Sequence, residues 1–315
     1  LERFTPEERD RFISNDRLWP ITHACNDKNW TSAAEDKALA YTLLQAGGVP
    51  VPETIAVIDA SARRYPGVPK IASVEDLRAI LQENTGPLFC KIADGMISFG
   101  AFRIESADEA SITCAGHAPM SFDAFLKDFV GDKPYLVQRE LTNHSALGPY
   151  ATALATVRMV NLVTDDGVMC PNAVIKLPQG ANIADAFWRP GNLACDVDPE
   201  TGVVRTVARR AIEMEFLEDH PDTAGLKGLT LPFWQELREI NERAAQLFAP
   251  IRYQSTDIAI TETGPVMVEI NYGGGFDLPQ YASGRGMMTP EVRSFFESCG
   301  VELSAKSKRR LSLFG

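Results

Sequence analysis

The stretch that most constrains the fold is residues 256–271, TDIAITETGPVMVEIN. Each half of it has one wholly apolar face at alternate positions, the two-residue period of a half-buried strand. Between the halves lies Glu262-Thr263-Gly264, which fits a three-residue hairpin loop that closes with glycine in the left-handed conformation. We therefore predict an antiparallel hairpin over these residues.

The other face of this hairpin brings two carboxylates together. With Thr261 paired to Pro265, Asp257 lies directly across from Glu269, and their Cβ atoms are about 5 Å apart. Asn271 projects from the same face one step further along. Two such carboxylates need either a shared proton or a divalent cation with oxygen ligands, and Mg²⁺ is the natural choice. The alternative is a sheet surface where water separates the acids. The glycines that follow at 273–275 favour the cation, because they let another group approach the backbone closely.

A lysine followed by a glycine-bracketed loop is the second signal. Lys91 lies near the end of a strand predicted over residues 87–92, and the loop 94–100 has glycine at positions 95 and 100. A lysine beside free backbone N–H groups can hold phosphate oxygens. A surface lysine beside a hairpin turn is the alternative. The chain has neither a Walker A sequence nor GxGxxG, so P-loop and Rossmann chemistry are not supported.

The rest of the chain predicts a mixed α+β fold with mostly hairpin-linked strands. Helices are predicted from cap residues at Thr5, Ser32, Ser73 and Thr289, and from an amphipathic run at 231–248. Strands are predicted at 54–58, 101–104 and 135–141, and a further hairpin at 153–172.

Composition excludes several classes of function. The chain has 31 Lys and Arg against 42 Asp and Glu, a net charge of −11, which disfavours non-specific binding to nucleic acid or anionic membranes. A nuclease built on Asp257 and Glu269 is therefore the least favoured function. Six cysteines without a CxxC pair indicate reduced thiols. With no secretion signal and no apolar run long enough for a bilayer, we expect a cytoplasmic protein without a membrane span. None of this decides between a monomer and a homo-oligomer.

The chain has, in this order, Lys37, the lysine strand with its glycine loop, the strand at 135–141 and the acidic hairpin. This order resembles the ATP-grasp superfamily, and within it the sugar-transfer-associated ATP-grasp proteins. The resemblance covers about residues 28 to 283 and is carried by residues 136–144, 156–160, 220–223, 231–234, 256–260 and 264–271. It implies an ATP-grasp fold of the α+β class, in which two lobes with antiparallel sheets grip the nucleotide. The small N-terminal lobe would span residues 1–72, the central lobe with the glycine loop 73–141, and the C-terminal lobe with the metal-binding hairpin 142–315.

The resemblance also implies roles for individual residues. Lys37 and Lys91 would contact the phosphates of ATP. The adenine slot would be formed by Gln138, Arg139, Glu140 and Leu141, with His144 near the ribose and Met267 against the base. Asp257, Glu269 and Asn271 would hold Mg²⁺. Arg158 would face the transferred phosphoryl group and, with Lys91, act in catalysis, although a buried arginine can also simply balance the acidic hairpin. Gln138 stands where family members usually have an acid.

The function implied by the resemblance is an ATP- and Mg²⁺-dependent ligase. It would join a small-molecule or peptide carboxylate to an amine or thiol through an acyl phosphate. The alternatives are a small-molecule kinase that phosphorylates a hydroxyl and a nucleotide-binding module without turnover. Residues 182–192, Gln280 and Arg285 are the candidates for the acceptor pocket, because they border the proposed site.

Overall fold

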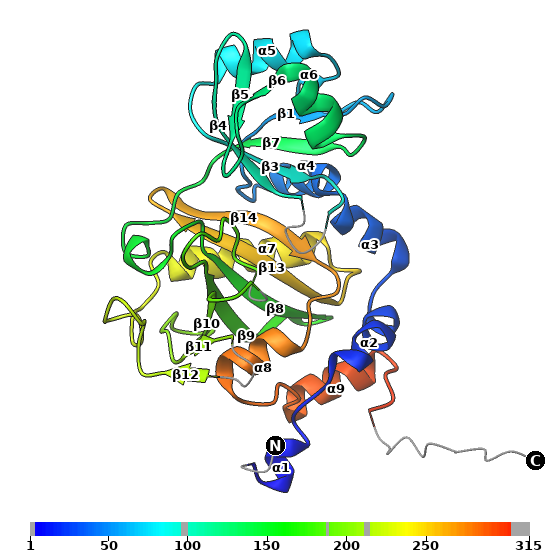
Figure 1. Cartoon of the computed structure of the whole chain (residues 1–315). Helices are drawn as coiled ribbons and strands as arrows, with labels where there is room; N and C mark the ends of the chain where they lie inside the picture. Colours follow the sequence, from blue (N-terminus) through cyan, green and yellow to red (C-terminus); the bar gives the residue numbers. More distant parts are fainter. Residues whose placement is uncertain (1–3, 96–99, 187–188, 211–214, 304–315) are drawn as a thin grey trace, which may run out of the picture.

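Two seven-stranded sheets form the frame of the protein, one above the other in Figure 1. The structure is a computed structural model that describes residues 4–95, 100–186, 189–210 and 215–303, and the sheet counts refer to these. The predicted loop 94–100 therefore lies partly outside the described residues, as does the predicted acceptor segment 182–192. The predicted α+β class is confirmed. Among the helices in this part of the chain, none is both long and apolar enough to cross a membrane.

The upper sheet contains the predicted lysine strand. Its strand order is β2 (Lys70–Ile71), β1 (Thr54–Ile58), β7 (Tyr135–Arg139), β3 (Leu88–Ile92), β4 (Phe102–Ala107), β5 (Ser111–Cys114) and β6 (Met120–Ser121). Every neighbouring pair is antiparallel except β1 and β2. A hydrophobic core of its own lies between this sheet, α5 (Val74–Glu83) and the helical segment of α6 (Phe122–Ala124) and Phe125–Val130.

The lower sheet carries the hairpin and is antiparallel throughout. Its order is β12 (Glu215–Leu217), β11 (Val207–Arg209), β10 (Leu193–Val197), β9 (Gly167–Leu177), β8 (Thr156–Thr164), β13 (Tyr253–Thr261) and β14 (Gly264–Asn271). The long helix α7 (Trp234–Leu247) contacts β8, β9, β13 and β14, and α8 (Asp277–Ser283) contacts β9, β10 and β11. These helices pack against apolar residues of the sheet. The site lies at the edge of this sheet nearest the upper sheet (Figure 1).

Short helices at both ends of the chain pack beside the lower sheet. They are α1 (Pro6–Arg9), a turn at Asn15–Arg17, α2 (Leu18–Cys25), α3 (Lys28–Glu35), α4 (Lys37–Ala46) and α9 (Pro290–Ser298), with one further turn at Gly148–Tyr150. Thr5, Ser73 and Thr289 cap helices as predicted. The predicted cap at Ser32 is wrong, because Ser32 lies inside α3. Asp27 caps α3 and Asp36 caps α4, since a short carboxylate accepts the free N–H groups of the first turn.

The hairpin β13–β14 forms with a register that differs from the predicted one at the turn. Thr261 pairs with Gly264 rather than with Pro265, so only two residues connect the strands. The register shifts between Ile258, which pairs with Met267, and Asp257, which pairs with Glu269. Val268 is thus one extra residue in β14, a β-bulge that restores the predicted pairing of the two carboxylates.

Candidate active site

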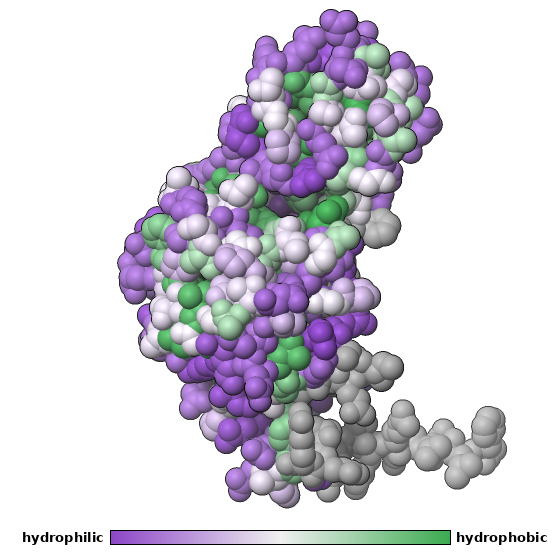
Figure 2. All heavy atoms as spheres, turned by 60° about the vertical axis from the view of Figure 1, so that its left-hand side comes forward, coloured by the Kyte–Doolittle hydropathy of each residue, from purple (hydrophilic) through white to green (hydrophobic). Residues whose placement is uncertain are grey.

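An open pocket lies where the two sheets meet, and it encloses about 960 Å³ counted out to its mouth. Figure 2 shows hydrophobic surface gathered at this waist between the upper and lower parts. Most of the predicted site residues line it: Lys37, Lys91, Gln138, Arg139, Glu140, Leu141, Asp257 and Glu269. They come from α4, β3, the end of β7 and both strands of the hairpin, so the fold assembles them from four separate regions of the sequence.

A row of charged residues crosses three neighbouring strands at the floor of the pocket. Asp257 on β13 pairs with Arg158 on β8 and with Glu269 on β14. The guanidinium of Arg158 donates to both oxygens of Asp257, from Nε at 3.0 Å and from Nη2 at 2.5 Å. Lys176 Nζ is 2.9 Å from Asp257 Oδ1 and also 2.9 Å from Asp185 Oδ2. Directly paired residues lie on the same face of a sheet, so the side chains of this row all lie on the face that is turned toward the pocket.

Asp257 is held as a carboxylate by its cationic neighbours. Burial by itself raises the pKa of a carboxyl group, but the charges of Arg158 and Lys176 outweigh it and hold the pKa of Asp257 well below its usual range. Burial likewise opposes the charge on Arg158, yet Asp257 raises the pKa of that guanidinium above its ordinary value. Arg158 is therefore engaged with the acidic hairpin and is not among the pocket-lining residues.

Two lysines flank the carboxylate of Glu269. Lys37 Nζ is 3.1 Å from Glu269 Oε1 and also donates to the carbonyl oxygen of Gly95. Lys91 Nζ donates to the hydroxyl of Tyr41 at 2.6 Å and to the carbonyl oxygen of Val268 at 3.1 Å. Burial lowers the pKa of Lys91, although Glu269 and Asp257 oppose this effect. Both lysines line the pocket and hold protein oxygens as partners, so phosphate oxygens that enter the pocket would replace or share these contacts.

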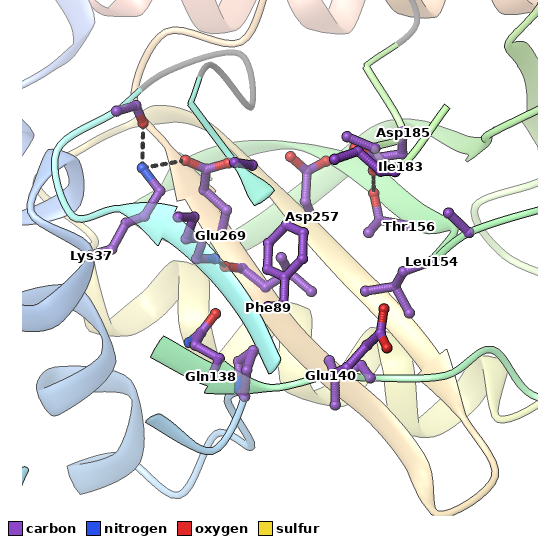
Figure 3. Close-up of a pocket in the computed structure, with 18 of the residues that line it drawn as sticks. Lys37, Phe89, Gln138, Glu140, Leu154, Thr156, Ile183, Asp185, Asp257 and Glu269 are labelled. Atoms are coloured by element: carbon purple, nitrogen blue, oxygen red, sulfur yellow. Dashed lines mark hydrogen bonds and ion pairs between the residues drawn. The ribbon is translucent and has the colours of Figure 1, made fainter. Parts of the chain in front are cut away.

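The opposite end of the pocket suits a flat apolar ring. In Figure 3 the side chains of Asp257 and Glu269 lie to one side of the Phe89 ring, and Gln138 and Glu140 to the other. Phe89 is one of several apolar residues in the lining of the whole pocket, and the others are Pro52, Ile92, Ala101, Leu141, Leu154, Ile183 and Val268. β7 ends at Arg139, so the peptide groups of Glu140 and Leu141 lie outside the strand ladder, where they can meet the edge of a base.

The structure places two predicted nucleotide contacts elsewhere. Met267 is fully buried in the core below the sheet, because the bulge at Val268 breaks the alternation of β14 and turns Val268 toward the pocket instead. The ring of His144 packs against Phe233 at 5.7 Å between centroids and lies outside the pocket lining.

The predicted acceptor residues are also divided. Ile183, Ala184 and Asp185 line the pocket, and Thr156 donates to Asp185. Gln280 instead bonds to the backbone at Ile13 and Phe276, and Arg285 pairs with Asp196, so neither lines it.

Sequence reasoning missed Lys176 and Tyr41. A signal for Lys176 was available, since it is the one charged residue in the otherwise apolar run 173–177. Such a lysine is seldom buried without carboxylate partners. Tyr41 gave no such signal, because a tyrosine in an amphipathic helix is ordinarily a packing residue.

The oxygen donors of the hairpin fit Mg²⁺. Asp257 and Glu269 supply carboxylates, and Asn271 lies close enough to donate its amide N–H to Asp257 Oδ2 at 3.3 Å, which leaves its own oxygen as a ligand. Within the described residues, no group of three His, Cys, Asp or Glu side chains is arranged to hold a metal alone. Mg²⁺ usually takes one or two protein carboxylates and completes its shell with waters and phosphates.

The lowered pKa of Lys91 gives a prediction for the pH dependence of the ATP binding that the resemblance implies. Phosphate oxygens favour the ammonium form, so affinity for a non-hydrolysable ATP analogue should fall as Lys91 loses its proton, at a pH below the usual lysine pKa of about 10.4. Calorimetry between pH 7 and 10 measures this. In Lys91→Arg the loss should disappear, because a guanidinium keeps its charge over that range. Lys127→Arg, on the surface, is the control, and an identical pH profile in Lys91→Arg would contradict the assignment.

Comparisons with known proteins agree with this geometry. The family model for sugar-transfer associated ATP-grasp proteins matches residues 20–294. No curated protein matches the sequence. Among solved structures, the biotin carboxylase–β,γ-ATP complex from Campylobacter jejuni has a TM-score of 0.51 at 12% identity, covering 96% of this chain and 54% of that one.

The D-Ala:D-Ser ligase VanG from Enterococcus faecalis has a TM-score of 0.48 at 13% identity, over 86% of this chain and 64% of its own. The chain therefore spans between half and two thirds of the length of these two proteins. The predicted ATP-grasp fold is confirmed.

Proposed function

The chain belongs to the sugar-transfer associated ATP-grasp family, and from this premise we propose that it is an ATP- and Mg²⁺-dependent ligase that joins a carboxylate to an amine or thiol. The observation that carries the proposal is the composition of one pocket. It combines an apolar slot around Phe89, the cations Lys37 and Lys91, and the carboxylates Asp257 and Glu269. A nucleoside triphosphate has the complementary parts, a flat base and a chain of phosphates that needs cations.

The side chains of the pocket support the first chemical step. Phosphoryl transfer asks mainly for positioning and for neutralisation of charge. Lys37 and Lys91 would neutralise phosphate oxygens, and Arg158 would keep Asp257 ionised and oriented. Mg²⁺, when held by Asp257, Glu269 and Asn271, would supply further charge neutralisation and orient the phosphates.

The reaction we propose has two steps, phosphoryl transfer to the carboxylate and attack of the amine on the acyl phosphate. An oxygen of the substrate carboxylate attacks the γ-phosphorus, the bond to the β-phosphate oxygen breaks, and ADP leaves behind an acyl phosphate. The nitrogen of the amine then attacks the acyl carbon, the bond from that carbon to the phosphate oxygen breaks, and phosphate departs with the proton from the amine. Partial enclosure between the two sheets would limit hydrolysis of the acyl phosphate.

An oxygen-18 experiment tests this reaction. The protein is incubated with ATP, Mg²⁺ and a panel of ¹⁸O-labelled carboxylates with amines and thiols, and products are analysed by mass spectrometry. The expected result is an amide or thioester, ADP, and inorganic phosphate that carries one ¹⁸O from the carboxylate. Unlabelled phosphate released together with the amide would contradict the acyl phosphate.

A small-molecule kinase is the second candidate. It is favoured by Asp185, a pocket carboxylate beside Thr156 that could accept the proton of a hydroxyl substrate. A stable phosphate ester and no free phosphate would identify the kinase. ATP binding without any ADP after a broad acceptor screen would instead identify a nucleotide-binding module.

A further inference from the structure

A second, smaller compartment opens beside the pocket. Its empty space counted out to open solvent is about 380 Å³, against about 960 Å³ counted in the same way for the pocket, so it suits one ring or side chain rather than a second nucleotide. Lys37, Gly95 and Glu269 line both spaces, and the ion pair of Lys37 with Glu269 therefore lies in their common wall. Whatever occupies this compartment is next to the phosphate-binding end of the pocket.

An exposed aromatic pair forms one side of the compartment. Trp19, on α2, has 45% of its surface exposed, which is unusual for so large an apolar side chain. Its ring lies 6.3 Å from that of Tyr272, and both residues line the compartment. Gly273 allows this arrangement, because a Cβ at that position would come within 3.2 Å of the Trp19 ring. Because the Trp19 side chain is partly exposed, part of its ring can contact a ligand in this compartment.

The free charge of this compartment is negative. Glu35, at the end of α3, is exposed, and in the described part of the chain it makes no ion pair and accepts no hydrogen bond. The positive charge of Lys37 is already matched by Glu269, and the Asn271 amide is directed to Asp257. Glu35 and Tyr272 line the same compartment, so the carboxylate lies beside the aromatic wall. Aromatic faces beside an unmatched carboxylate favour an organic cation.

We propose that this compartment binds the amine substrate as its ammonium ion, with Trp19 and Tyr272 against the apolar part and Glu35 opposite the charge. The inference rests on the proposed ligase function and adds to it the chemical class of the nucleophile and its place of entry. The shared wall puts the bound ammonium ion beside Lys37, next to the place where the acyl phosphate would form. The ammonium ion first gives one proton to water, and the neutral amine is then the nucleophile. Trp19 and Glu35 come from the N-terminal helices, so these helices would set the specificity for the amine.

Binding of phenethylammonium, compared with the neutral phenethyl alcohol, tests the proposal. Dissociation constants are measured by ligand-observed NMR at pH 7 in the full chain. Wild type should prefer the ammonium ion, and Trp19→Ala and Glu35→Gln should each weaken its binding by about two- to fivefold, the range of an exposed cation–π or charge contact. Leu39→Ala, which truncates another exposed apolar residue on α4, should leave binding unchanged. Glu7→Gln, on α1, is the matched control for charge.

Equal binding of the alcohol and the ammonium ion would overturn the proposal, as would binding that neither Trp19→Ala nor Glu35→Gln weakens. Titration with a non-hydrolysable ATP analogue and Mg²⁺ in the same proteins separates this result from the ligase proposal. Both variants should bind the analogue as wild type does, because neither residue lines the nucleotide pocket. Wild type that binds the ammonium ion but no ATP analogue would keep the cation site and overturn the ligase.

Discussion

Replacing Glu269 with Gln is expected to lower ATP turnover by about 10²–10³-fold, the usual loss when one group that stabilises developing charge is removed. Gln keeps the shape of the side chain but removes the charge that faces Lys37 and the proposed Mg²⁺. Turnover is measured with the substrates that the carboxylate and amine panel identifies. Calorimetry with Mg²⁺ and a non-hydrolysable ATP analogue gives a second measurement that does not depend on those substrates.

Glu262→Gln is the matched control, because Glu262 lies at the turn of the same hairpin and outside the pocket lining. Its turnover and its Mg²⁺-dependent affinity for the analogue should equal those of wild type. The carboxylate of Glu269 is partly exposed but its partner Lys37 is buried, so loss of the charge lowers stability, and urea denaturation verifies that the variant is folded before turnover is compared. A folded Glu269→Gln protein with wild-type turnover would overturn the metal site and, with it, the proposed role of the hairpin.

Replacing Asp257 with Asn is expected to lower the free energy of unfolding by about 3–5 kcal/mol, the usual cost of removing one partner from a buried ion pair. The carboxylate of Asp257 is buried and receives both Arg158 and Lys176. Without its charge, the buried Lys176 and the half-buried Arg158 lose their shared partner, and Lys176 keeps only Asp185. Urea denaturation at pH 7 measures the difference, and Asp165→Asn, in the exposed turn between β8 and β9, is the control.

The pH dependence of this difference is a second check on Asp257. The pKa of its carboxyl group is lowered in the folded state, so the unfolded chain binds the proton more readily. The stabilisation is therefore complete above the unfolded pKa of about 3.9 and is lost as the pH falls below it toward the folded value. Wild type and Asp257→Asn should thus converge in stability at low pH. A constant difference down to acid pH would contradict the assignment of the charge to Asp257.

The hairpin shows how far sequence reasoning reaches. Alternation within a strand is a local property, so the two strands and their carboxylates could be predicted from residues 256–271. Asp257 pairs with Glu269 as predicted, but the turn and the register that produce this pairing differ from the prediction. The turn is one residue shorter than predicted, and the bulge at Val268 compensates for it. The same bulge explains why Met267 lies in the core and not in the pocket lining, since an extra residue reverses which side chains face the core.

The α+β class, three of the four predicted helix caps and the polar face of the hairpin follow from the sequence, because these features depend on residues close together in the chain. Three contacts could be seen only in the folded protein: Lys176 lies between Asp185 and Asp257, Lys91 donates to Tyr41, and the Trp19 ring lies beside that of Tyr272. The physical reason is that such contacts join segments whose relative positions follow from how sheets and helices pack. Packing depends on the shape and burial of all the surfaces together, and no local period or spacing encodes it.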